Sequence, residues 1–151
     1  MNKTTFKTFE KNSFFALAIC APLIAALIFF LLPDLAIISV AKLEIAVVGY
    51  CVALLGFFAG TRFGDLINGM GAQTAWIIPF LAGPIVGLAI LLLPFSLSLA
   101  VLIAAFGGHG AWDSWASFNG KLPKEYWARR TLLTWMICLI LIAIFVIDGM
   151  G

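Results

Sequence analysis

The sequence has little charge, and this shortage limits the kind of protein that it encodes. Only 11% of its 151 residues are charged and 64% are hydrophobic, whereas soluble domains carry roughly 25% charged residues. This composition excludes an ordinary water-soluble fold and indicates a protein whose solvent is largely lipid. The net charge of +2 is also too small for a nucleic-acid-binding surface, so we expect no nucleic-acid partner.

The sequence is equally poor in residues that hold metals or perform catalysis. It contains one histidine, and its three cysteines, Cys20, Cys51 and Cys138, fall in separate apolar runs without the paired spacing of a zinc or redox site. Catalytic triads, zinc-protease helices and phosphate-binding glycine loops are absent as sequence patterns. We therefore expect no metal, no cofactor and no catalytic residue, and we interpret the cysteines as buried structural thiols.

The sequence is rich in long apolar runs. A hydrocarbon core about 30 Å thick needs roughly 20 helical residues, and the runs predict spans near residues 13–32, 45–64, 74–93, 96–111 and 131–147. The third and fourth spans share one uncharged stretch, which we divide at Leu93-Pro94-Phe95-Ser96 because proline ends a helix. The predicted fold class is all-α: residues 1–151 form a single integral membrane domain, a compact bundle of five transmembrane helices with short loops.

Two prolines, Pro79 and Pro84, lie inside the third predicted span. Because proline removes a backbone donor and clashes with the preceding turn, we expect this helix to be kinked. Carbonyl groups freed at such a kink can coordinate a transported ion. However, the sequence has no inverted repeat and no acidic residue at the membrane midplane, so a transporter is a less favoured alternative.

Basic residues predict the orientation of the bundle. The five-span path puts eight of them on one side and only Lys42 on the other: Lys3, Lys7, Lys11, Arg62, Lys121, Lys124, Arg129 and Arg130. Because basic loops remain in the cytoplasm, we expect a multi-pass protein of the bacterial inner membrane with a cytoplasmic N-terminus and an exterior C-terminus. All five tryptophans fall near the same cytoplasmic boundary, where interface anchors are common.

Small residues form a ladder in two of the predicted spans. The second span has Gly49, Gly56, Gly60 and Gly64 on one stripe, and the fourth has Ala100, Ala104 and Gly108. Such stripes allow helix backbones to approach closely in lipid. We therefore predict that the second and fourth spans pack together, with the alternative that a ladder joins two copies in a homodimer.

Ionisable residues gather at the cytoplasmic ends of these same spans. Arg62 and Asp65 end the second span, His109 and Asp113 end the fourth, and Arg130 begins the fifth. Residues three or four apart share one face of a helix, so docking of the spans would form one charged cluster. This cluster could bind the head group of a lipid or quinone. The alternative is that Arg62 pairs with Asp65, and Arg129 or Arg130 with Asp113, to tether the helix ends.

Two stretches carry a resemblance to a known family. The first, YCVALLGFFAGTRFG at residues 50–64, resembles a pattern of tyrosine, small-residue helix and Gly-x-His/Arg-Trp-Gly, with Phe63 in place of tryptophan and Ala59 in place of a glycine. The second resembles Asp followed by Leu-Pro-x-Trp-Tyr-x-x-Leu-Arg-x-x-Leu-Thr, and its matching residues are Asp113, Leu122, Pro123, Tyr126, Arg130, Leu133 and Thr134. Glu125 and Arg129 depart from this pattern.

These patterns are similar to those of the five-span membrane family designated domain of unknown function 3429, which includes bacterial proteins and a mitochondrial transmembrane relative. The resemblance covers roughly residues 15–147. It implies five spans and directs attention to Arg62, Asp113, Tyr126 and Arg130 as recurring polar positions. It supplies no reaction.

The sequence therefore predicts a non-enzymatic small integral membrane protein that acts by binding. The favoured function is an accessory or assembly component of a membrane complex, with the lipid bilayer and either a membrane-protein partner or a second copy as its partners. The alternative is a lipid or quinone head-group binding protein that uses the charged cluster. A membrane enzyme and a transporter follow as less favoured functions.

Overall fold

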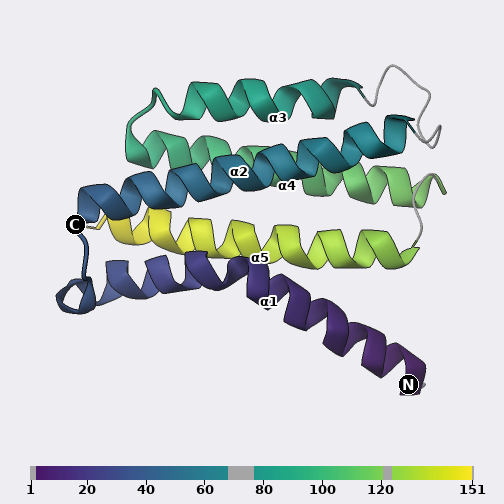
Figure 1. Ribbon diagram of the computed structural model, residues 1–151, viewed down its shortest axis with the longest axis horizontal. Coiled ribbons are helices and arrows are strands. Elements are labelled where there is room, and N and C mark those ends of the chain that lie inside the picture. The colour runs from purple at the N-terminus through teal and green to yellow at the C-terminus, as the bar shows by residue number, and fades with distance from the viewer. Residues whose placement is uncertain (1–2, 68–76, 121–123, 151) are drawn as a thin grey trace.

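All secondary structure that the structure describes is helical. The computed structural model describes the backbone of residues 3–67, 77–120 and 124–150, and the side chains of residues 13–61, 83–120 and 129–150. It contains α1 (Lys3–Leu31), the short 3-10 helix η1 (Pro33–Leu35), α2 (Val40–Ile67), α3 (Ile77–Ile90), α4 (Phe95–Phe118) and α5 (Lys124–Asp148) (Figure 1). The predicted all-α class is confirmed.

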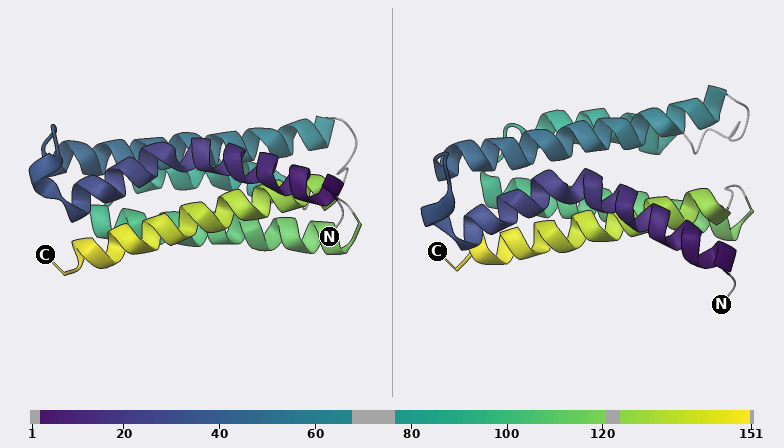
Figure 2. Two further views of the ribbon diagram at one scale, coloured as in Figure 1. Left: turned by 90° about the horizontal axis from the view of Figure 1, so that it is seen from below. Right: turned by 60° about the horizontal axis from the view of Figure 1, so that its bottom comes forward.

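Successive α-helices run in opposite directions along one long axis. The N-terminus therefore lies at one end of the bundle and the C-terminus at the other (Figure 1), and the two views in Figure 2 show the same near-parallel packing. We call these the N-terminal end and the C-terminal end of the bundle. The N-terminal end also contains the last turns of α2 and α4 and the first turns of α5.

Four helices are long and apolar enough to cross a membrane, which supports a multi-pass membrane protein. These segments are Ser13–Leu31, Val40–Thr61, Phe95–Phe118 and Arg129–Asp148. The described part of α3 has 14 residues, about 21 Å of helix, which is shorter than a hydrocarbon core. Residues 74–76 of the predicted third span lie outside the described residues, so the third span, its kink and the total of five spans stay predictions.

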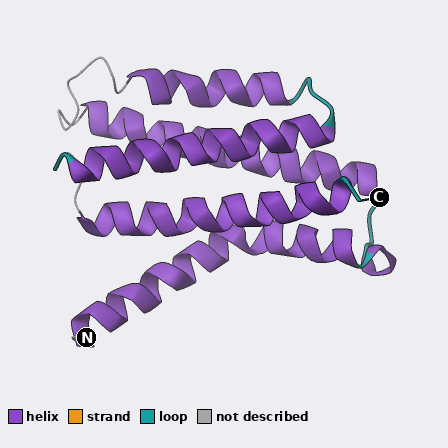
Figure 3. Cartoon of the chain, turned by 180° about the vertical axis from the view of Figure 1, so that it is seen from behind, coloured by secondary structure: helices purple, strands orange, loops and turns teal. Residues whose placement is uncertain are grey.

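The turn predicted around Pro94 is present. Helix α3 ends at Ile90 and α4 begins at Phe95, directly after Pro94. A visible bend occurs elsewhere, in α1, whose N-terminal part slopes away from the bundle (Figures 1 and 3). This helix contains Pro22, and an internal proline is a common cause of such a bend because it interrupts the backbone hydrogen bonds.

The core lies between the helices that pack most extensively, which are α4 with α5, α2 with α3, and α1 with α5. Its largest fully buried side chains are Phe58, Phe106, Leu23, Leu55, Ile90, Leu99, Leu102, Ile137, Leu141 and Ile144. Helices α2 and α4 touch through two of them, Phe58 and Phe106, whose rings meet edge to face at 5.7 Å. Large aromatic side chains therefore take part in the contact between these two helices.

The small-residue ladders lie on the outer faces of their helices. Gly49, Gly56 and Gly60 are exposed, and a Cβ atom added at any of them would meet nothing within 4 Å. Ala100, Ala104 and Gly108 are exposed as well, and Gly64 lies outside the residues whose side chains are described. Helices α2 and α4 do meet, as predicted. The described ladder residues do not make this contact, because Phe58 faces the core and the ladder lies on the opposite face of α2.

Other glycines make the close helix contacts. A Cβ atom at Gly83 of α3 would lie 2.9 Å from the Cβ atom of Ala59 and 3.3 Å from the carbonyl oxygen of Leu55, both in α2. At Gly110 of α4 it would lie 3.1 Å from the Cγ2 atom of Thr134 in α5. These two positions bring α2 close to α3 and α4 close to α5.

Candidate functional site

A buried ion pair joins α4 to α5 at the N-terminal end of the bundle. The Nε atom of Arg130 donates a hydrogen bond of 2.8 Å to the Oδ2 atom of Asp113, and the side chains are 8% and 0% exposed. Removing two charges from water costs several kcal/mol each, at order of magnitude, and their mutual attraction must offset this cost. Neither charge is therefore tolerable in this place without the other.

The close approach of α4 and α5 explains why these two side chains meet. Gly110 leaves room for Thr134, as described above, and Thr134 lies four residues after Arg130 on α5. Asp113 follows Gly110 by three residues, so it lies on the same side of α4. Because glycine has no side chain, Gly110 lets α4 and α5 approach closely, and the Asp113 carboxylate comes within reach of the Arg130 guanidinium.

Thr61 connects the ion pair to α2. The Nη1 atom of Arg130 donates a hydrogen bond of 2.5 Å to the hydroxyl oxygen of Thr61, and that hydroxyl donates one of 2.8 Å to the carbonyl oxygen of Phe58. A threonine hydroxyl within a helix often bonds back to a carbonyl of the preceding turn. Its oxygen is then oriented to accept from the guanidinium, so one arginine links three helices.

The ring of Phe58 completes the surroundings of the guanidinium. The Cζ atom of Arg130 lies 4.7 Å from the ring centroid, within the range of a cation–π contact. The same ring stacks on His109, with centroids 5.8 Å apart and an interplanar angle of 27°. Because His109 is also buried, the aromatic ring places the histidine and the arginine in one enclosed cluster.

Three of the six predicted site residues are brought together: His109, Asp113 and Arg130. The ion pair uses Arg130, whereas Arg129 is exposed, which decides an assignment that the sequence left open. The side chains of Arg62, Asp65 and Tyr126 lie outside the described residues, so their part in the cluster stays a prediction.

Sequence reasoning missed Phe58 and Thr61, which supply the aromatic and hydroxyl contacts of the cluster. Phe58 lies one helical turn before Arg62, and Thr61 lies directly before it. Their position beside a basic residue at the end of an apolar span was a weak signal for both. We name Arg130, Asp113, Thr61, Phe58 and His109 the three-helix cluster.

The chemistry open to the three-helix cluster is limited by its own contacts. Arg130 already donates to Asp113 and Thr61 and lies over Phe58, so its charge is balanced by groups of the chain itself. In the part of the chain that the structure describes, no group of three potential metal ligands occurs. The three cysteines are buried and form no disulfide, in agreement with their interpretation as structural thiols.

No family model, curated protein or solved structure matches this chain. The resemblance to domain of unknown function 3429 therefore depends on the two sequence stretches alone and stays a prediction.

Proposed function

We propose that this chain is a small, non-enzymatic membrane protein that serves as an accessory or assembly component of a membrane complex. In this proposal it binds other membrane helices through the small-residue faces of α2 and α4. The observation that carries the proposal is the exposure of Gly49, Gly56 and Gly60, where the chain itself places no atom within 4 Å of an added Cβ.

The glycines of this chain divide into two groups. Gly83 and Gly110 lie against neighbouring helices of the same chain, so their small size serves the bundle. Gly56 and Gly60 serve no contact within the described residues, although each glycine in a helix interior costs about 1 kcal/mol relative to alanine. Small faces in lipid favour close packing of helices, which makes a helix from another chain the best match for these positions.

The three-helix cluster supports this proposal through its position inside the bundle. Its ion pair ties α4 to α5, and its threonine contact adds α2. The cluster thereby holds the two helices that carry the exposed ladders in one arrangement. A preformed surface loses less conformational entropy on binding than a mobile one, so an internal polar link suits an assembly component.

We infer that the protein resides in a bacterial inner membrane with the N-terminal end of the bundle in the cytoplasm. Seven of the nine basic residues belong to described helix segments of this end, against Lys42 alone at the other. The positive-inside rule favours this orientation. Accessibility tags at Asn2 and Gly151 in intact cells test it, and labelling of both ends from one side would contradict it.

Substitution of the exposed ladder tests the proposed function. Gly56→Leu combined with Gly60→Leu fills the face with side chains that meet nothing inside the chain. Because leucine is also the better helix former, the variant should unfold at the same or a higher temperature than the native chain. Affinity purification in mild detergent should recover a stoichiometric membrane protein with the native chain and lose most of it with the variant.

The matched control is Ala21→Leu, which adds a similar side chain at an exposed position of α1. This control should retain the partner. Equal recovery of the partner by the ladder variant would contradict the proposed surface. Recovery of only a second copy of the chain would replace the accessory function by a homodimer.

A further inference from the structure

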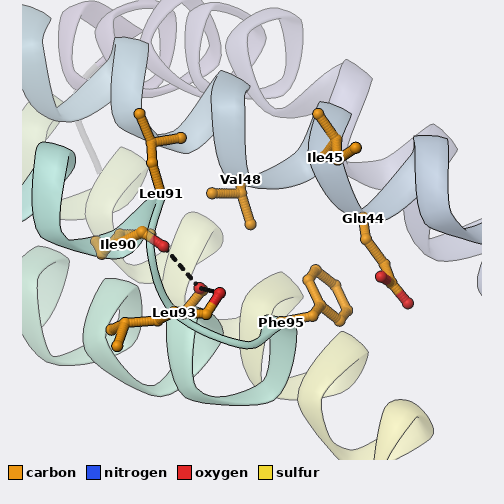
Figure 4. A pocket seen from close by; sticks show the side chains of 8 residues that line it. Glu44, Ile45, Val48, Ile90, Leu91, Leu93 and Phe95 are labelled. Atoms are coloured by element: carbon orange, nitrogen blue, oxygen red, sulfur yellow. Dashed lines mark hydrogen bonds between the residues drawn. The ribbon is translucent and has the colours of Figure 1, made fainter.

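A cavity of about 230 Å³ lies at the C-terminal end of the bundle, far from the three-helix cluster. Its walls come from the first turns of α2, the end of α3 and the start of α4 (Figure 4). Most of its lining is apolar, with Val48, Ile90 and Phe95 among the side chains. Two lining residues are polar, Glu44 and Ser98.

Glu44 is the unusual member of this lining. Its side chain is half-buried, yet it makes no hydrogen bond or ion pair with any residue whose side chain the structure describes. Lys42 does not pair with it, because residues two apart point to different sides of a helix. A half-buried carboxylate in apolar surroundings is stabilised by a cation, and no residue whose side chain is described supplies one here.

The charge around the cavity also favours a cation. The Ser98 hydroxyl is fully buried and donates to the carbonyl oxygens of Ile90 at 3.0 Å and Leu93 at 3.3 Å, so it holds the end of α3 against the start of α4. Ile90 ends α3, and the C-terminal end of a helix carries partial negative charge. The C-terminal end of the bundle is acidic as a whole, because its described segments contain Asp34, Glu44 and Asp148 but one basic residue, Lys42.

An aromatic ring stands next to the carboxylate. Figure 4 shows the Phe95 ring beside Glu44 at one end of the cavity. Phe95 is held by Phe30 of α1, whose ring stacks on it with centroids 5.7 Å apart and an interplanar angle of 16°. A carboxylate beside a fixed aromatic ring is a suitable arrangement for an ammonium group, which binds to both.

We propose that this cavity binds a primary ammonium group, with Glu44 as its counter-ion. A primary ammonium has N–H donors that hydrogen-bond to the Glu44 carboxylate, whereas a quaternary ammonium has none. The cavity is smaller than the 300 to 1,000 Å³ that is usual for whole drug-sized ligands, so it fits a head group. Ile45 and Leu91 at its rim are exposed apolar residues, which points to an ethanolamine phospholipid as the source.

Lipid exchange in nanodiscs tests this site. The full chain is reconstituted in phosphatidylcholine with a minor fraction of phosphatidylethanolamine, and the lipids that stay bound are counted by native mass spectrometry. We expect about tenfold preferential retention of phosphatidylethanolamine by the native chain, and loss of that preference in Glu44→Gln, since a hydrogen bond to a charged group contributes about this factor or more. Asp34→Asn removes an exposed carboxylate at the same end but outside the cavity, and it should leave the preference unchanged.

A second titration, with soluble ethanolamine in a phosphatidylcholine nanodisc, distinguishes the two sources of the ammonium group. Binding of ethanolamine that depends on Glu44, without a preference between the lipids, would support the ammonium site and assign it a soluble ligand. Equal retention of the two lipids by the native chain with no ethanolamine binding would overturn the proposal, as would a preference for phosphatidylcholine. Neither result depends on the folding of a variant.

Discussion

The two ends of the bundle hold the same helices together with different chemistry. At the N-terminal end, α4 and α5 share the ion pair of Asp113 and Arg130, which is almost completely buried. At the C-terminal end, the same two helices share an exposed hydrogen bond of 2.6 Å from the Ser96 hydroxyl to the Asp148 carboxylate. One contact encloses both of its charges, whereas the other leaves its single charge near the surface.

This difference shows where charge is part of the fold and where it is open to a ligand. An enclosed charge needs its partner permanently, because without it the full cost of desolvation is exposed. A charge near the surface can keep its water or exchange it for another group. The N-terminal end is thus committed to holding α2, α4 and α5 together, while Glu44 at the C-terminal end has no partner in the described residues and can take one.

The largest expected effect comes from breaking the enclosed pair. Asp113→Ala leaves the Arg130 guanidinium buried without a carboxylate, and the free energy of unfolding should fall by about 3–5 kcal/mol. Unfolding of the purified protein in mixed detergent micelles, followed by circular dichroism, measures this change.

The control for this prediction removes both charges together. Asp113→Leu with Arg130→Met replaces the pair by apolar side chains of similar size, and it should recover most of the lost stability. If Asp113→Ala alone costs less than about 1 kcal/mol, water reaches the pair and the contrast between the two ends of the bundle is lost.

A smaller effect is expected from the aromatic ring of the three-helix cluster. Phe58→Leu removes the contacts of the ring with Arg130, His109 and Phe106. Because aromatic pairs contribute about 0.5–1.5 kcal/mol beyond their buried area, we expect a loss of about 1–2 kcal/mol in the same unfolding measurement.

The neighbouring residue gives a matched control. Phe57 is 56% exposed while Phe58 is 1% exposed, so Phe57→Leu should change the unfolding free energy by only a few tenths of a kcal/mol. Equal losses for the two variants would mean that the buried ring adds nothing specific to the N-terminal end.

The sequence could predict the features that depend on length and hydropathy. Length and hydropathy are local properties, so the helices, four of the spans and the turn before Phe95 followed from the apolar runs and from Pro94. The grouping of His109 and Asp113 with Arg130 was also predicted, but from a contact between the glycine ladders that the helices do not make.

The inward faces of the helices could not be predicted in this way. A helix in lipid is apolar all round, so the periodic pattern that marks the core side of a soluble helix is missing. Phe57 and Phe58 are identical neighbours, yet only one is buried. The glycine ladder of α2 was equally ambiguous, since small residues suit close packing within the chain and with another chain.

At the C-terminal end, Ser98→Ala should have a modest effect. The Ser98 hydroxyl is buried and bonds the carbonyl oxygens of Ile90 and Leu93, so it closes the turn between α3 and α4. Side-chain hydrogen bonds in membrane proteins contribute about 0.6 kcal/mol on average, and we expect a loss of about 1 kcal/mol because two acceptors lose a donor. Detergent unfolding measures it, and a loss as large as that of Asp113→Ala would remove the difference between the ends.

The smallest effect should come from Ser96→Ala, which cuts the exposed link between α4 and α5. Asp148 then exchanges the serine hydroxyl for water at nearly equal free energy, so the unfolding free energy should fall by no more than about 0.5 kcal/mol. The two substitutions Ser96→Ala and Asp113→Ala act on the same pair of helices, and their losses should differ at least fivefold. A loss above about 2 kcal/mol for Ser96→Ala would show that the carboxylate of Asp148 is enclosed in the membrane, and both ends would then depend on buried charge.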